Sequence, residues 1–165
     1  MTTATPVHGL RDRSPGRRGG FTMIDVVITV MIVGILAAVA TPRFVDALSF
    51  HRVDAAAKRI KADLQWSRQH AMSSSAAILI QFDTDSNSYT IPAINDPDRT
   101  GQTYTVDLTQ YPYCSTLISA ACGGDSDLSL SRYGQPDSTA VITMQSGKYT
   151  QTVTVNAATG GVSIP

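Results

Sequence analysis

One carboxylate, that of Asp25, lies inside an otherwise uncharged run of 21 residues that is almost entirely apolar, residues 21–41. An unpaired acid at the centre of a membrane helix costs about 2.5 to 3.5 kcal/mol on insertion scales, and less near the interface. Asp25 is therefore expected either to meet a cationic partner or to snorkel to the lipid headgroups.

Other residues with reactive side chains do not form a catalytic pattern. His8, His51 and His70 are scattered along the first 70 residues, and none lies near a serine or cysteine in an arrangement that supports nucleophilic catalysis. His70 is expected on a helix surface, and Trp66 in the core or at an interface. We expect no enzymatic activity and no cofactor.

Acidic residues suggest a metal site at two places. Residues 83–87, DTDSN, reproduce the first ligands of a calcium loop, but its sixth position is Ser88 instead of glycine and its twelfth is Ile94 instead of an acid. A hairpin turn is the preferred interpretation. Asp125 and Asp127 are interpreted as loop residues, so no metal ligand is assigned.

Size and charge fit one modest domain and one membrane segment. The chain has 165 residues, of which 42% are hydrophobic and 16% charged, and its formal net charge is zero. Residues 1–20 hold four arginines and one aspartate, which leaves nine basic and twelve acidic residues in the remainder. Such a balance does not supply the cationic surface that nucleic acids require, so nucleic acid is an unlikely partner.

Residues 21–41 are long enough to cross a membrane. As a helix they span about 31 Å, which matches the roughly 30 Å hydrocarbon core. Four arginines precede the segment. The positive-inside rule then places the N-terminus in the cytoplasm and the later residues in the periplasm or outside the cell, with the chain crossing the inner membrane once.

An ordinary secretory signal is the alternative, because residues 38–40, AVA, resemble its cleavage site. The apolar run is longer than the usual h-region, and a carboxylate inside a disposable segment is expensive. Arg17 and Arg18 fit a twin-arginine signal poorly.

The sequence GGFTMID at residues 19–25, followed by an apolar segment with Gly34 and Pro42, resembles the class III signal of type IV prepilins. The resemblance implies that a prepilin peptidase cleaves after Gly20 and methylates the new amino group of Phe21. It also implies that Asp25 pairs with the Phe21 amine of a neighbouring subunit during filament assembly. The family usually has glutamate at this position, so the charge is kept with a shorter reach.

An amphipathic helix is expected over residues 42–75, continuing the membrane helix and ending near the serines at 73–75. Pro42 predicts a kink or local melting near residues 38–42. The pairs Asp54 with Lys58 and Arg59 with Asp63 have helical spacing and are interpreted as a solvated face. The apolar stripe consists of Phe44, Leu48, Val53, Ala57, Ile60, Leu64 and Ala71.

Residues 76–165 are expected to form a β-rich domain, with strands at 77–82, 89–91, 141–144, 152–155 and 162–164. The predicted fold class is α+β, a long N-terminal helix packed on a mostly antiparallel sheet. Residues 64–71, 133–136 and 159–164 resemble the GspH/FimT group of minor pseudopilins.

Cys114 and Cys122 are expected to form a disulfide. They lie in a segment rich in serine, alanine and glycine with no histidine nearby, which gives too few ligands for structural zinc. The expected location is oxidising, and the bond would hold a loop that has few apolar residues.

Three functions are compatible with these observations. The favoured one is a minor pseudopilin, a structural subunit of a type II secretion pseudopilus or related type IV pilus, whose partners are the prepilin peptidase, other pilins or pseudopilins, and the membrane. A DNA-binding minor pilin for DNA uptake is the alternative, although Lys148 is the one basic residue after Arg132. A secreted soluble domain with an ordinary signal peptide is the third.

Overall fold

The computed structural model describes residues 20–165. The chain divides into two compact units, Met1–Ala40 and Thr41–Pro165. Of the leader predicted for residues 1–20, all but Gly20 lies outside the described residues.

One long helix, α1, begins at Met23 and ends at Ser74. Its helical pattern continues through Pro42, so the predicted local melting is not observed. A proline removes one hydrogen bond of the helical ladder, and the alanines before it are strong helix formers. The predicted end of the helix near the serines is confirmed. The hydroxyls of Ser73 and Ser74 donate to the His70 carbonyl oxygen, and Ser75 takes a left-handed backbone conformation.

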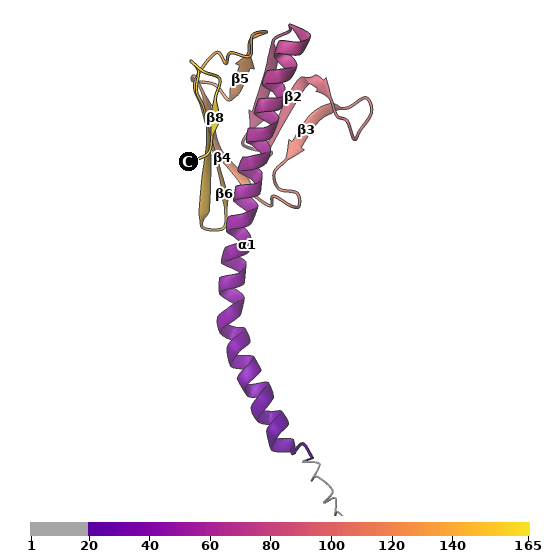
Figure 1. Cartoon of the computed structure of the whole chain (residues 1–165), viewed down its shortest axis with the longest axis vertical. Helices are drawn as coiled ribbons and strands as arrows, with labels where there is room; N and C mark the ends of the chain where they lie inside the picture. Colours follow the sequence, from indigo (N-terminus) through magenta and orange to yellow (C-terminus); the bar gives the residue numbers. More distant parts are fainter. Residues whose placement is uncertain (1–19) are drawn as a thin grey trace, which may run out of the picture. The chain divides into compact units, whose positions relative to one another are not determined.

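Eight strands follow the helix and form two antiparallel sheets of four strands each (Figure 1). The first sheet has the order β3-β2-β1-β5 and the second β4-β6-β7-β8. The α+β class is confirmed, but the strands form two sheets where one was expected. The strands are β1 Ile78–Asp83, β2 Ser88–Asn95, β3 Thr103–Asp107, β4 Thr116–Cys122, β5 Asp127–Leu130, β6 Ala140–Ser146, β7 Tyr149–Val155 and β8 Val162–Ser163.

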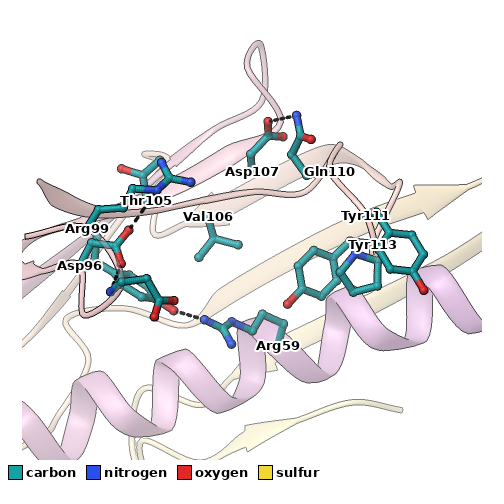
Figure 2. Close-up of a pocket in the computed structure, with 12 residues that line it drawn as sticks. Arg59, Asp96, Arg99, Thr105, Val106, Asp107, Gln110, Tyr111 and Tyr113 are labelled. Atoms are coloured by element: carbon teal, nitrogen blue, oxygen red, sulfur yellow. Dashed lines mark hydrogen bonds and ion pairs between the residues drawn. The ribbon is translucent and has the colours of Figure 1, made fainter.

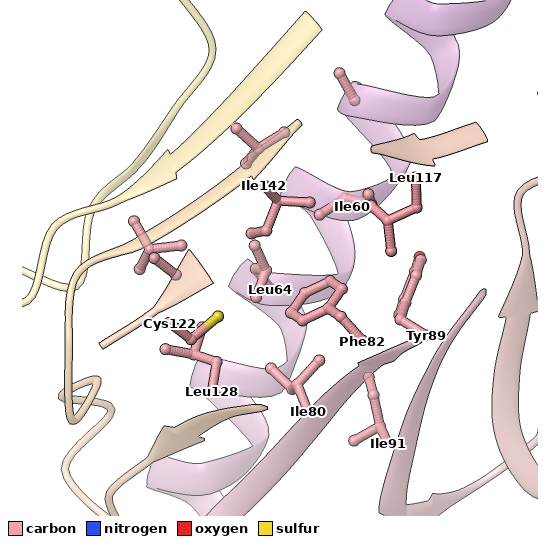
Figure 3. Packing of buried hydrophobic residues seen from close by; sticks show 14 of the residues in the cluster. Ile60, Leu64, Ile80, Phe82, Tyr89, Ile91, Leu117, Cys122, Leu128 and Ile142 are labelled. Atoms are coloured by element: carbon pink, nitrogen blue, oxygen red, sulfur yellow. The ribbon is translucent and has the colours of Figure 1, made fainter. Parts of the chain in front are cut away.

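The core forms between one face of α1 and the inward faces of both sheets (Figure 3). Inward residues alternate along β1 and β6 with exposed or half-buried ones, as a pleated strand requires. Ile60 and Leu64 of α1 lie among Ile80, Phe82 and Ile142 of the sheets. The apolar stripe of α1 therefore packs as predicted from Val53 onward, whereas Phe44 and Leu48 stay exposed.

The segment resembling a calcium loop is a hairpin turn, as predicted. It joins β1 to β2, and the Asp83 carboxylate accepts hydrogen bonds from the backbone N–H groups of Asp85 and Ser86 and from the Ser86 hydroxyl. Asn87 closes the turn with a φ of 54°, a conformation that asparagine tolerates.

Two glycines in the segments that resemble GspH/FimT proteins meet the same side chain of α1, Arg68. A Cβ atom on Gly134 would lie 2.8 Å from Arg68 Cγ, and one on Gly160 would lie 3.0 Å from Arg68 Cζ. Arg68 Nη1 also donates to the Gly160 carbonyl oxygen over 3.2 Å. Both glycines have positive φ, so backbone conformation and close packing each disfavour a larger residue here.

Candidate assembly helix and its domain

The predicted assembly residues lie at the N-terminus of α1. Phe21 is 89% exposed and Gly20 is also exposed. The Asp25 carboxylate accepts hydrogen bonds from the Thr22 backbone N–H over 3.0 Å and from the Thr22 hydroxyl over 2.7 Å. In return, the Asp25 backbone N–H donates to the Thr22 hydroxyl oxygen over 3.3 Å.

This arrangement is a reciprocal N-terminal cap, in which Thr22 and Asp25 satisfy backbone donors that the first turn leaves free. The role of Thr22 as a helix cap was not predicted from the sequence. Its sequence signal is a threonine followed three residues later by an acidic residue. Asp25 therefore has a local partner within its own chain. A neighbouring amine would have to compete with these hydrogen bonds.

The following turns of α1 present apolar side chains outward. Every residue from Met23 to Val45 is exposed within this chain. Within residues 20–165, α1 is the helix long and apolar enough to cross a membrane. A single N-terminal helix of this kind fits a membrane anchor, and a signal sequence has the same properties.

Further along α1, Asp63 forms a buried polar cluster. Its Oδ2 atom accepts hydrogen bonds from the Tyr89 hydroxyl over 2.5 Å, the Tyr104 hydroxyl over 2.8 Å and Arg59 Nε over 3.1 Å. Asp63 is 7% exposed. The interpretation of Asp63 as part of a solvated face is thus wrong, because two strands bring tyrosine hydroxyls over it.

The electrostatics of this cluster follow from its burial. Burial, together with the hydrogen bond to Asp63 and its negative charge, raises the pKa of Tyr104 to about 12. The same causes, burial first, raise the pKa of Tyr89 well above its usual range. Burial alone would lower the pKa of Arg59, but Asp63 and Tyr104 raise it above its ordinary value. The cluster thus keeps both phenols neutral and the guanidinium charged, and it fastens α1 to β2 and β3.

The disulfide predicted between Cys114 and Cys122 is not formed in this structure. Both thiols are free; Cys122 is the last residue of β4, and Cys114 lies two residues before its first, Thr116. A strand rises about 3.3 Å per residue, so Thr116 and Cys122 lie roughly 20 Å apart along β4, whereas a disulfide needs Cα atoms about 4.4–6.8 Å apart. The segment that was interpreted as a loop forms a strand instead, because β4 pairs with β6.

The remaining candidate residues stay apart. His51 and His70 are exposed, and Trp66 packs partly exposed against the Tyr104 ring with a centroid distance of 5.6 Å. His8 lies outside the described residues. Within residues 20–165, no group of three or more histidine, cysteine or acidic side chains could hold a metal ion.

The long N-terminal helix with an exposed apolar half and its antiparallel sheets define a pilin-like fold. Comparison with solved structures gives the same class. The chain is similar to the type IV minor pilin FimU of Pseudomonas aeruginosa, with 18% identity over 70% of this chain and 89% of that one and a TM-score of 0.53. It is also similar to the minor pseudopilin EpsH from the Type 2 Secretion System of Vibrio cholerae, with 13% identity over 69% of this chain and 96% of that one and a TM-score of 0.53.

At these identities the likeness establishes the fold. No protein-family model and no curated protein matches the sequence. The resemblance stated for residues 64–71, 133–136 and 159–164 agrees with the fold of the two structures.

Proposed function

We propose that this chain is a minor pseudopilin or minor pilin, a non-catalytic structural subunit that assembles through α1 into a type II secretion pseudopilus or a related type IV pilus. The observation that carries the proposal is a pilin-like domain on a helix whose exposed apolar half has one carboxylate at its start. Prepilin peptidase cleaves after Gly20 and the amino group of Phe21 is methylated. The helix anchors the subunit in the inner membrane, with the domain on the periplasmic or outer side.

The proposed role of Asp25 follows from its surroundings. Cleavage would create a cationic amine at Phe21, four residues before the carboxylate. When helices stack in a filament, the amine of one subunit can approach the Asp25 carboxylate of the next, where low water access strengthens the pairing. The Thr22 cap keeps the carboxylate hydrogen-bonded until that exchange occurs.

Three variants separate pairing from capping. Asp25→Asn removes the charge but keeps an oxygen that can accept from Thr22, and Asp25→Glu restores the family's usual residue. Thr22→Val is the matched control, because it removes the capping hydroxyl and leaves the charge. Each full chain is expressed at equal level, and crosslinking between neighbouring subunits and filament-dependent secretion are measured.

Pairing predicts that the Asn variant inserts and folds but crosslinks at least about tenfold less, because breaking a buried ion pair costs about 3–5 kcal/mol. The Glu and Thr22→Val variants should assemble. Unchanged assembly by the Asn variant would remove Asp25 from the proposal. Loss with Thr22→Val and not with Asn would instead assign the role to the cap.

The two solved structures come from a pilus and a secretion system, so they support filament assembly equally in either. The DNA-uptake alternative gains no support from the described residues, because the last two basic residues of the sequence are Arg132 and Lys148. Each lies over a neighbouring tyrosine ring, and Lys148 also pairs with Asp46.

A further inference from the structure

A polar groove of about 730 Å³ lies beside β3 (Figure 2). Arg59 of α1 lines one side of it, and two loops, residues 96–99 and 110–113, line the ends. Val106 and Thr105 both contribute to the lining. Since successive residues of a strand point to opposite faces, the groove must follow the edge of β3.

That edge is free. β3 is the terminal strand of its sheet and pairs with β2 on one side. The Leu108 N–H donates to the Asn87 carbonyl oxygen over 3.0 Å, and antiparallel hydrogen bonds alternate along a strand. Counting from that bond, the backbone N–H and C=O groups of Val106 point to β2, whereas those of Thr105 and Asp107 point to the groove. An unpaired edge is a template for another extended chain.

Backbone hydrogen bonds within the chain hold the loops at the two ends of the groove. The Ser115 N–H donates to the Leu108 carbonyl oxygen over 2.8 Å, and the Tyr113 N–H donates to that of Gln110 over 2.9 Å. At the other end, the Asp96 N–H donates to the Gln102 carbonyl oxygen over 2.8 Å. A partner would therefore meet a preformed site, which reduces the entropy cost of binding.

The charge of the groove is negative once its internal pairs are considered. Arg59 is paired with Asp63, and Arg99 with Asp96 over 3.9 Å. Asp98 and Asp107 also line the groove, and neither forms an ion pair with any side chain in the described part of the chain. Tyr111, 86% exposed, adds an aromatic ring on which a cationic side chain can stack.

We propose that this groove docks an extended, lysine- or arginine-bearing segment of a different protein, which adds to β3 as a further strand. Backbone hydrogen bonds to Thr105 and Asp107 hold the segment, and Asp98, Asp107 and Tyr111 select its basic side chains. A second copy of this chain does not fit. If β3 of one copy paired with β3 of another, the one charged residue it would bring to the groove is Asp107, and it would bring no basic residue. The inference is independent of the filament system.

The test uses the purified full chain in detergent micelles and fluorescein-labelled seven-residue peptides that alternate valine with lysine, serine or glutamate. Binding is measured by fluorescence anisotropy at low salt. A fourth peptide carries N-methyl groups on the backbone of the lysine sequence, which removes its backbone hydrogen-bond donors and keeps its charge.

Three protein variants accompany the peptides. Thr105→Pro removes a backbone donor that points to the groove and not to β2, a position at which an edge strand tolerates proline. A double variant, Asp98→Asn with Asp107→Asn, removes the negative charge and keeps hydrogen-bond acceptors. Asp85→Asn, in the exposed β1–β2 turn, is the matched control for charge.

The lysine peptide should bind at least about tenfold more tightly than the glutamate peptide, and N-methylation should remove binding. The double variant should weaken binding about threefold to tenfold, as expected for two exposed ion pairs, and Asp85→Asn should leave it unchanged. If Thr105→Pro fails to fold, the N-methylated peptide still tests the strand pairing, through the peptide N–H groups that would donate to carbonyl oxygens of β3. Equal binding of the lysine and glutamate peptides, unchanged binding after N-methylation, or no binding by any peptide would overturn the proposal.

Discussion

Replacing Asp63 by asparagine tests whether the buried cluster fastens the sheet to the helix. The substitution keeps the volume and one hydrogen-bond acceptor but removes the charge that Tyr89, Tyr104 and Arg59 share. Hydrogen bonds to a charged group contribute about 1.5–3 kcal/mol each, against about 1 kcal/mol for neutral ones. Because the three bonds converge on one oxygen and Arg59 is partly solvated, their losses do not add fully.

We therefore expect Asp63→Asn to lower the free energy of unfolding by about 2–3 kcal/mol. For a domain of this size, that corresponds to a fall in Tm of roughly 6–9 °C. The assay is urea unfolding of the full chain in detergent, followed by the fluorescence of Trp66. This residue is the sole tryptophan and packs 5.6 Å from Tyr104, so it reports the region directly.

The matched control is Asp54→Asn on the same helix. Asp54 also pairs with a basic residue four positions later, Lys58, over 2.7 Å, but that pair is solvated. Exposed pairs contribute about 0.2–1 kcal/mol, so the control should change little. A loss below about 0.5 kcal/mol for Asp63→Asn, or an equal loss for both variants, would refute the importance of the buried cluster.

Three further predictions concern single side chains. The pKa of Tyr104 is raised to about 12 in the folded chain from an ordinary value of 10.0, so the unfolded chain loses this proton first as the pH rises. The free energy of unfolding, measured by denaturant titration, should therefore fall from about pH 10 to about pH 12. In Tyr104→Phe it should fall less steeply with pH. Gly134→Ala should lower the free energy of unfolding in urea by about 2–4 kcal/mol, because φ at Gly134 is 73° and an added Cβ would meet an arginine of α1. Gly101→Ala is the control: φ there is 83° but the space is open, so the loss should be about 1–2 kcal/mol. Alkylation without reductant should modify Cys114 in the native chain and Cys122 only after unfolding, because burial raises the pKa of the Cys122 thiol to about 11. A disulfide that protects both thiols from alkylation until they are reduced would contradict the strand geometry.

The elements predicted correctly have strong local signals. The helix boundary at the serines and the strands now seen as β1, β6 and β7 depend on apolar periodicity and β-branched residues. β3, β4 and β5 were missed because they are short or rich in serine, alanine, threonine and aspartate. Their strand form depends on pairing with neighbours, which local sequence does not contain.

The candidate site divides in the same way. Gly20, Phe21 and Asp25 lie within one short motif, so sequence alone could propose them as processing and assembly residues. Asp63 was not found in this way, because its tyrosine partners lie 26 and 41 residues away and its helical spacing to Arg59 is typical of a solvated pair. The groove beside β3 was missed for the same reason, since its lining comes from a helix, a strand and two loops.

The most direct test of the central claim is the mass of the N-terminal peptide of the chain isolated from membranes. A filament subunit processed as proposed begins at Phe21 and carries one methyl group on its amine. A chain that begins at Thr41, after the AVA sequence, has lost the apolar half of α1 with Asp25 and cannot assemble through it. That result would contradict the account and identify the segment as an ordinary signal peptide.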